Sequence, residues 1–201
     1  MDMDSLLENR ISPILETEGF KRKGRRFLRR TGGFEHVVDI SKGRGMMQGK
    51  FAVSFGAHPM VEGFPGLPAL PLRSGDHWLT YRLAPPGLDD RWWWIDRLYP
   101  DDVEEIGNLL TKGLGEWFSP LMSLEAFSEN WYRQVFIIAF ASKRYGPSAA
   151  RLAYLHAAVF ASLGQTGTAL KVAETARSLA GPHATTFVGW IQELDAVLRS
   201  K

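Results

Sequence analysis

The spacing of apolar side chains changes along the chain, and each change predicts a different kind of element. Residues 5–17 carry apolar groups at helical spacing, which predicts an N-terminal helix with one apolar face: Leu7, Ile11, Ile14 and Leu15. Pro13 interrupts this pattern, so we expect the helix to be kinked or divided at Ser12-Pro13. Strand-like runs at 37–40 and 51–55, separated by glycine-containing turns, then predict a three-stranded meander.

Residues 58–100 are irregular because prolines recur there: Pro59, Pro65, Pro68, Pro71, Pro85 and Pro86. Residues 78–83 nevertheless alternate and predict a strand, and residues 92–95 predict another whose two apolar faces imply a covered sheet. The loop 59–76 is long for a compact domain and contains large apolar side chains. We therefore expect this loop to pack on the body of the protein, and its role stays open.

From residue 101 the period becomes helical. We expect helices at 101–118, 127–145, 149–163, 168–179 and 183–198. The predicted fold class is α+β: an N-terminal helix on a mainly antiparallel sheet of about five strands, followed by a C-terminal helical half. We expect residues 1–100 to form the α+β domain and residues 101–201 a helical region packed against it, with one continuous domain as the alternative.

The first half contains a helix ending at Gly19-Phe20, a basic run Lys21-Arg22-Lys23-Gly24 with Phe27 soon after, and a strand at 51–56. These features resemble the DUF4304 family of uncharacterised bacterial domains. The resemblance covers the N-terminal half and implies a bacterial α+β module for which no catalytic residues can be carried over.

Small residues recur at the spacing of a close helix pair near the C-terminus: Ala153, Ala157, Ala161, Ala169, Ala173 and Ala176. This pattern resembles one tetratricopeptide-like helical hairpin, because small side chains let two helices approach closely. A compact α-hairpin is the simpler interpretation, since stable arrays of such repeats contain about three units.

Composition limits the chemistry that the chain can perform. The 201 residues contain no cysteine, which excludes disulfides, thiolate catalysis and cysteine-ligated zinc. The acidic N-terminus is unlike a signal peptide, and the longest apolar run, residues 135–141, is too short to span a membrane. We therefore expect a cytoplasmic protein without a membrane partner.

Positive charge is concentrated in one segment, although the formal net charge is only +2. Seven cations lie within ten residues: Lys21, Arg22, Lys23, Arg25, Arg26, Arg29 and Arg30. One interpretation is a solvated edge strand, because cations on an edge prevent edge-to-edge association. Its charge would be partly neutralised by Asp2, Glu16, Glu18 or Glu35. The other is a surface that binds a polyanion or an acidic partner.

Three consecutive tryptophans form the second candidate site: Trp92, Trp93 and Trp94. Flanked by Arg91 and Arg97, they could form a partner-binding surface, since Trp and Arg are enriched at binding hot spots. The alternative, which we favour, is a core strand that buries rings on both of its faces.

Familiar catalytic and metal-binding patterns do not occur in the sequence. The five histidines lack ligand spacing, the glycine-rich turns lack the phosphate-loop ending, and no serine stands in a nucleophile elbow. We therefore assign no catalytic residues, no metal ligands and no cofactor.

The preferred functional hypothesis is a non-enzymatic protein-binding protein, adaptor-like or immunity-like, that uses the sheet edge, the proline-rich loop or the helical hairpin. The first alternative is nucleic-acid or polyanion binding through residues 21–30. The second alternative is an enzyme whose site is assembled through space from arginines, acids and His36, His58 or His77. The oligomeric state stays open.

Overall fold

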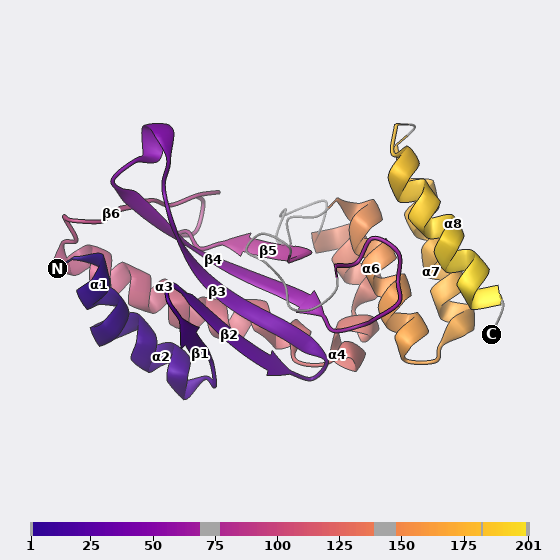
Figure 1. The fold of residues 1–201 in the computed structure, drawn as a ribbon, viewed down its shortest axis with the longest axis horizontal. Helices are drawn as coiled ribbons and strands as arrows, with labels where there is room; N and C mark the ends of the chain where they lie inside the picture. The colour runs from indigo at the N-terminus through magenta and orange to yellow at the C-terminus, as the bar shows by residue number, and fades with distance from the viewer. Residues whose placement is uncertain (1, 69–76, 139–147, 182, 200–201) are drawn as a thin grey trace. The chain divides into compact units, whose positions relative to one another are not determined.

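The predicted α+β class is confirmed by a computed structural model, which describes residues 2–68, 77–138, 148–181 and 183–199. An irregular N-terminal helix precedes a six-stranded antiparallel sheet within these residues, and the C-terminal half is helical (Figure 1).

The N-terminal helix is divided, as expected from Pro13. It consists of α1 (Met3–Leu6), a π-helical turn η1 (Leu7–Ile11) and α2 (Ser12–Thr17). Pro13 lies in the first turn of α2, directly after the π-helical turn, so the irregular turn stands where proline cannot donate a helical hydrogen bond. The Phe20 N–H donates to the Leu15 carbonyl at 2.9 Å, which closes the helix at the predicted end.

The sheet is a meander with the order β1-β2-β3-β4-β5, and β6 pairs with β4 outside this path. Its strands are β1 (Lys21–Lys23), β2 (Arg26–Thr31), β3 (Phe34–Lys42), β4 (Lys50–Pro59), β5 (Leu79–Arg82) and β6 (Trp93–Trp94). β1 stands at one end of the order, so the basic segment contains an edge strand. Lys50 faces Trp94 and Phe51 faces Trp93 in the β4–β6 register.

The chain forms two compact units. The sheet unit comprises Met1–Thr31, Glu35–Ala57 and Thr80–Ser119, and the helical unit comprises Gly32–Phe34, His58–Leu79 and Pro120–Lys201. Both units contain residues from before and after residue 100. The predicted division at residue 100 stays a prediction.

The core of the sheet unit forms where α3 (Pro100–Phe118) covers the sheet. The Phe55 ring lies 5.8 Å from the Trp117 ring and 5.1 Å from the Phe118 ring, measured between centroids. Phe118 also contacts Phe20 at 5.8 Å, which joins the end of the N-terminal helix to the same cluster. Because large aromatic side chains bury the most apolar surface, this cluster dominates the packing of the unit.

The helical unit confirms the predicted C-terminal hairpin and last helix. Its elements, with the turn η3 (Ser119–Leu121) that leads into it, are α4 (Leu124–Glu129), η4 (Arg133–Ile138), α6 (Ala149–Ser162), α7 (Thr166–Leu179) and α8 (Thr185–Arg199). α6 and α7 pack through small residues, of which Ala153, Ala157 and Ala173 are fully buried. The helix expected at 127–145 is interrupted after Glu129, and residues 139–147 of that prediction lie outside the described residues.

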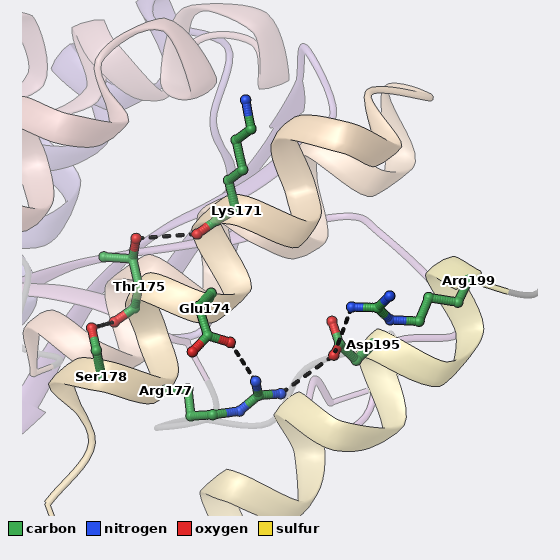
Figure 2. A network of polar contacts seen from close by, with 7 residues as sticks. All are labelled: Lys171, Glu174, Thr175, Arg177, Ser178, Asp195 and Arg199. Carbon is green, nitrogen blue, oxygen red and sulfur yellow. Dashed lines mark hydrogen bonds and ion pairs between the residues drawn. The ribbon is translucent and has the colours of Figure 1, made fainter.

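A network of ion pairs links α7 to α8 (Figure 2). The Arg177 guanidinium contacts the Glu174 carboxylate on its own helix and the Asp195 carboxylate on α8, the second at 3.4 Å. Asp195 also lies 3.7 Å from Arg199. Such solvent-accessible pairs stabilise a fold by less than about 1 kcal/mol each. The network therefore adds only a small stabilisation to the packing of α7 against α8.

The described part of the proline-rich loop packs on the helical unit, as expected. The Tyr154 hydroxyl donates to the Pro65 carbonyl at 2.5 Å, and burial raises the pKa of this phenol, which keeps the donor proton in place. Trp78 lies beside Tyr154 with 5.8 Å between ring centroids. Residues 69–76 of the loop lie outside the described residues.

Candidate partner-binding surface

The turn between β3 and β4 is ordered by backbone hydrogen bonds. The Gly43 N–H donates to the Lys50 carbonyl at 2.8 Å, and the short 3-10 helix η2 (Gly45–Met47) fills the turn. The Met47 and Gln48 N–H groups donate to the Arg44 and Gly45 carbonyls at 3.1 and 3.0 Å. We call residues 42–50 the hairpin tip; in Figure 1 the ribbon between β3 and β4 extends well beyond β5 and turns back on itself.

The hairpin tip and the adjoining strand β6 each expose one large apolar side chain. Met46 is 98% exposed, and the neighbouring Trp94 of β6 is 49% exposed. The Lys50 ammonium lies 4.7 Å from the centroid of the Trp94 ring, a cation–π contact that orients the ring. We call Lys42, Arg44, Met46, Lys50 and Trp94 the tip surface.

Trp94 faces solvent because Trp93 is held in the core. Trp93 is 1% exposed, and its indole N–H donates to the Glu105 carboxylate of α3 at 2.9 Å. The same Glu105 oxygen accepts from Arg91 at 3.0 Å. Neighbouring residues of a strand point to opposite faces, so fixing Trp93 inward turns Trp94 outward.

The three tryptophans therefore have three environments. The core interpretation is correct for Trp93, which is 1% exposed, and wrong for Trp94, which is 49% exposed. Trp92 is half-buried, and its indole N–H donates to the Asp90 carboxylate at 2.6 Å. The Arg82 guanidinium lies 5.0 Å above the Trp92 ring and 3.4 Å from Asp90, so Trp92 belongs to a local polar cluster.

Four of the seven cations of the basic segment contact the protein itself. Arg30 donates two hydrogen bonds to one Glu35 oxygen, at 2.9 and 2.8 Å, and Arg26 lies 3.8 Å from Asp39. Arg22 donates to the Gly24 carbonyl at 2.9 Å. These contacts are those of a partly neutralised sheet edge.

The fourth of these cations, Arg29, is the most enclosed. Its guanidinium donates to the Glu18 carbonyl at 2.8 Å, lies 4.6 Å from the Phe20 ring centroid and is 3.2 Å from the Nδ1 atom of His36. Burial lowers the pKa of Arg29, and Glu18 opposes this shift. The His36 ring is fully buried and packs 4.5 Å from Phe118, so Arg29 and His36 belong to the interior of the sheet unit.

The remaining three cations are Lys21, Lys23 and Arg25. All three are exposed, and their side chains have no hydrogen-bond or ion-pair partner within the described ranges. They lie on β1 and on the turn that follows it. Arg22 is exposed as well and has no carboxylate partner within the described ranges, so four cations of residues 21–30 are not neutralised there.

The polar groups named for an assembled active site belong to both units, with His36 in the sheet unit and His58 and His77 in the helical unit. Arg29 and His36 are in contact inside the sheet unit, whereas His58 lines a cavity of about 350 Å³ in the helical unit. That cavity is formed by residues 58–63 with Leu67 and Pro68, so Glu62 is the second ionisable group on it. Groups of three or more metal-ligating side chains do not occur in the part of the chain that the structure describes.

A buried histidine in the helical unit makes the stability of the protein depend on pH. His156 is fully buried, stacks on Phe127 with 3.8 Å between ring centroids, and lies 3.1 Å through its Nε2 atom from the Gln134 side-chain oxygen. Burial lowers the pKa of His156 well below its ordinary value of 6.5. The folded protein therefore keeps this ring neutral at pH values where the unfolded chain takes up a proton.

We expect this difference to destabilise the fold in mild acid. Because only the unfolded chain binds the proton below pH 6.5, His156 should lower the free energy of unfolding by about 1.4 kcal/mol between pH 7.5 and pH 5.5. Urea denaturation of the wild type and of His156→Gln at both pH values measures this contribution. An equal pH dependence in the two proteins would contradict it.

Sequence reasoning included Trp94 among the candidates and missed the other four residues of the tip surface: Lys42, Arg44, Met46 and Lys50. The available signal was the Met46-Met47 pair inside a glycine-rich turn, where a strand or helix cannot bury both side chains. None of the described helices combines the length and the apolar character that crossing a membrane requires.

Comparisons with models of protein families, with curated proteins and with solved structures give no match. The resemblances to the DUF4304 family and to a tetratricopeptide-like hairpin stay predictions.

Proposed function

We propose that the protein is a non-enzymatic binding protein whose tip surface engages another protein. The supporting observation is Met46, which is 98% exposed on a hydrogen-bonded turn. Burying such a side chain stabilises a fold by about 1.5–3 kcal/mol, so an ordered turn that leaves it in water has no benefit for folding. A binding partner that covers Met46 would gain this free energy instead.

The other residues of the tip surface are typical of protein interfaces. Trp, Met and Arg are enriched in interface cores, and Trp is among the most frequent hot-spot residues. The Lys50 ammonium makes a cation–π contact with the Trp94 ring, and Trp94 is still 49% exposed. An adaptor-like or immunity-like role in the cytoplasm and membership of the DUF4304 family complete this proposal.

Removal of the apolar part of the tip surface should abolish partner capture. We expect the wild type to recover one stoichiometric protein from an extract of the source cell, and Met46→Ser/Trp94→Ala to recover it at least tenfold less, because a hot-spot residue contributes about 2 kcal/mol or more. Quantitative mass spectrometry of the captured material measures the ratio.

Leu88→Ser is the matched control, because Leu88 is 55% exposed in the same unit and is not part of the tip surface. Its capture should equal that of the wild type, and circular dichroism should show that all three proteins are folded. Equal recovery by the double variant, or no stoichiometric protein with the wild type, would overturn the proposal.

A second candidate function is polyanion binding through Lys21, Lys23 and Arg25, which is favoured by their exposure and lack of partners within the described ranges. Three phosphate contacts predict that the logarithm of the duplex-DNA binding constant falls with the logarithm of salt concentration with a slope of about −3. Lys23→Glu/Arg25→Glu should abolish this binding, whereas Met46→Ser/Trp94→Ala should leave it unchanged. No retention on heparin at low salt would exclude this function.

A further inference from the structure

The charges of the hairpin tip indicate which kind of partner it binds. Residues 42–50 contain three cations, Lys42, Arg44 and Lys50, and no acidic residue. We infer that the partner presents an acidic polypeptide segment that also carries an exposed apolar side chain. This inference rests on the proposed function of the tip surface.

Five of the ten arginines of the sheet unit lie within 4 Å of a carboxylate, and the tip cations do not, within the described residues. Ion pairs hold Arg26 to Asp39 and Arg30 to Glu35, and Arg91 to Glu105, at 3.8, 2.8 and 3.0 Å. The ion pairs of the described residues include none of the three tip cations. Lys42 and Arg44 are exposed, so a partner carboxylate can approach them without displacing a carboxylate of this chain.

The β1–β2 turn extends this positive surface. The Ile40 N–H donates to the Arg25 carbonyl at 3.0 Å, which places the turn beside β3 two residues before Lys42. Arg25 on that turn and Lys23 at the end of β1 are both exposed. Arg25 therefore adds an exposed cation beside the strand that leads to the hairpin tip, which favours a partner of opposite charge.

The apolar side chains distinguish a protein from a nucleic acid as the partner. Phosphates could neutralise Lys42 and Arg44, but they would leave the Met46 side chain in water. The thioether of methionine is flexible and polarisable, so Met46 can adapt to an apolar side chain on an opposing surface. A segment that combines carboxylates with an apolar group satisfies both parts of the tip surface.

Selection from a random peptide library displayed on phage tests the inference. The full chain serves as bait, and peptides that also bind Met46→Ser/Trp94→Ala are discarded. We expect the remaining peptides to be net acidic and to contain at least one aromatic or aliphatic residue. Their affinity should fall at least tenfold for Lys42→Glu/Arg44→Glu and stay unchanged for Leu88→Ser. An oligoglutamate peptide of equal charge should bind at least tenfold more weakly.

Each other result overturns a defined part of the proposal. Neutral or basic peptides that depend on Met46 and Trp94 would overturn the acidic partner and leave the binding function standing. Equal binding of oligoglutamate would show that the apolar part of the partner is not needed. If no peptide depends on the tip, the inference fails, and the capture experiment above decides separately whether the proposed function fails with it.

Discussion

Gly32→Ala is expected to lower the free energy of unfolding by about 3 kcal/mol, through backbone strain and a steric clash together. Gly32 has a φ of +52°, and a Cβ atom there would lie 1.7 Å from the Met122 carbonyl oxygen and 2.8 Å from the Ser123 Cα atom. These are backbone atoms that cannot rotate away.

The surrounding hydrogen bonds prevent the 122–124 backbone from moving away without a loss of stability. The Leu124 N–H donates to the Gly32 carbonyl at 3.0 Å, and the Ser123 hydroxyl caps α4 by accepting from the Ala126 N–H at 3.0 Å. Moving the 122–124 backbone to admit a methyl group would break the first bond and disturb the cap. The turn at Gly32 and the start of α4 therefore have to change together.

Gly24→Ala is the matched control, because Gly24 has a φ of +65° and nothing within 4 Å of the added Cβ. It carries the backbone strain alone, which costs about 1–2 kcal/mol. Urea denaturation of the two variants measures the difference, which is the cost of the clash with residues 122–123. Equal losses would show that the Gly32 turn does not contact that backbone in solution.

Gly113→Ala is expected to lower the free energy of unfolding by about 2 kcal/mol, because overpacking of a filled core outweighs the better helix propensity of alanine. A Cβ atom at Gly113 would lie 2.3 Å from the Phe55 ring. Phe55 is 1% exposed and is enclosed by the Trp117 and Phe118 rings at 5.8 and 5.1 Å, so the ring has no space into which it can move.

Gly107→Ala in the same helix should have the opposite effect on the free energy of unfolding. Nothing lies within 4 Å of a Cβ atom at Gly107, so the substitution should raise the free energy of unfolding by up to about 1 kcal/mol through helix propensity alone. Thermal unfolding of the two variants checks both signs. Stabilisation by both substitutions would contradict the packing of α3 on Phe55.

Most elements of the fold could be predicted from local sequence. Periodicity identified the helices and strands, Pro13 the division of the first helix, and Gly19 its end. The ion pairs of Arg29 with Glu18 and of Arg30 with Glu35 could also be predicted, because these acids are close in sequence to the basic segment. Local pattern and tertiary structure agree at these positions.

The candidate site could be predicted only in part, because tertiary contacts decide it. Three identical residues in succession contain no periodicity, so the sequence could not show which tryptophan faces the core. Glu105 on α3 settles this by accepting the Trp93 indole N–H at 2.9 Å. The stacking of Arg29 on Phe20 and its contact with His36 likewise depend on how helix and strands meet, which residue types alone do not reveal.

The position of Met46 has a consequence for handling the protein. Met46 is 98% exposed, so peroxide readily reaches its thioether and converts it to a polar sulfoxide. Material aged in air should then keep its circular dichroism and melting temperature while it loses the partner, and methionine sulfoxide reductase should restore binding. Samples that look intact by every folding criterion would give a false negative in a binding assay unless the oxidation state of this side chain is checked by mass.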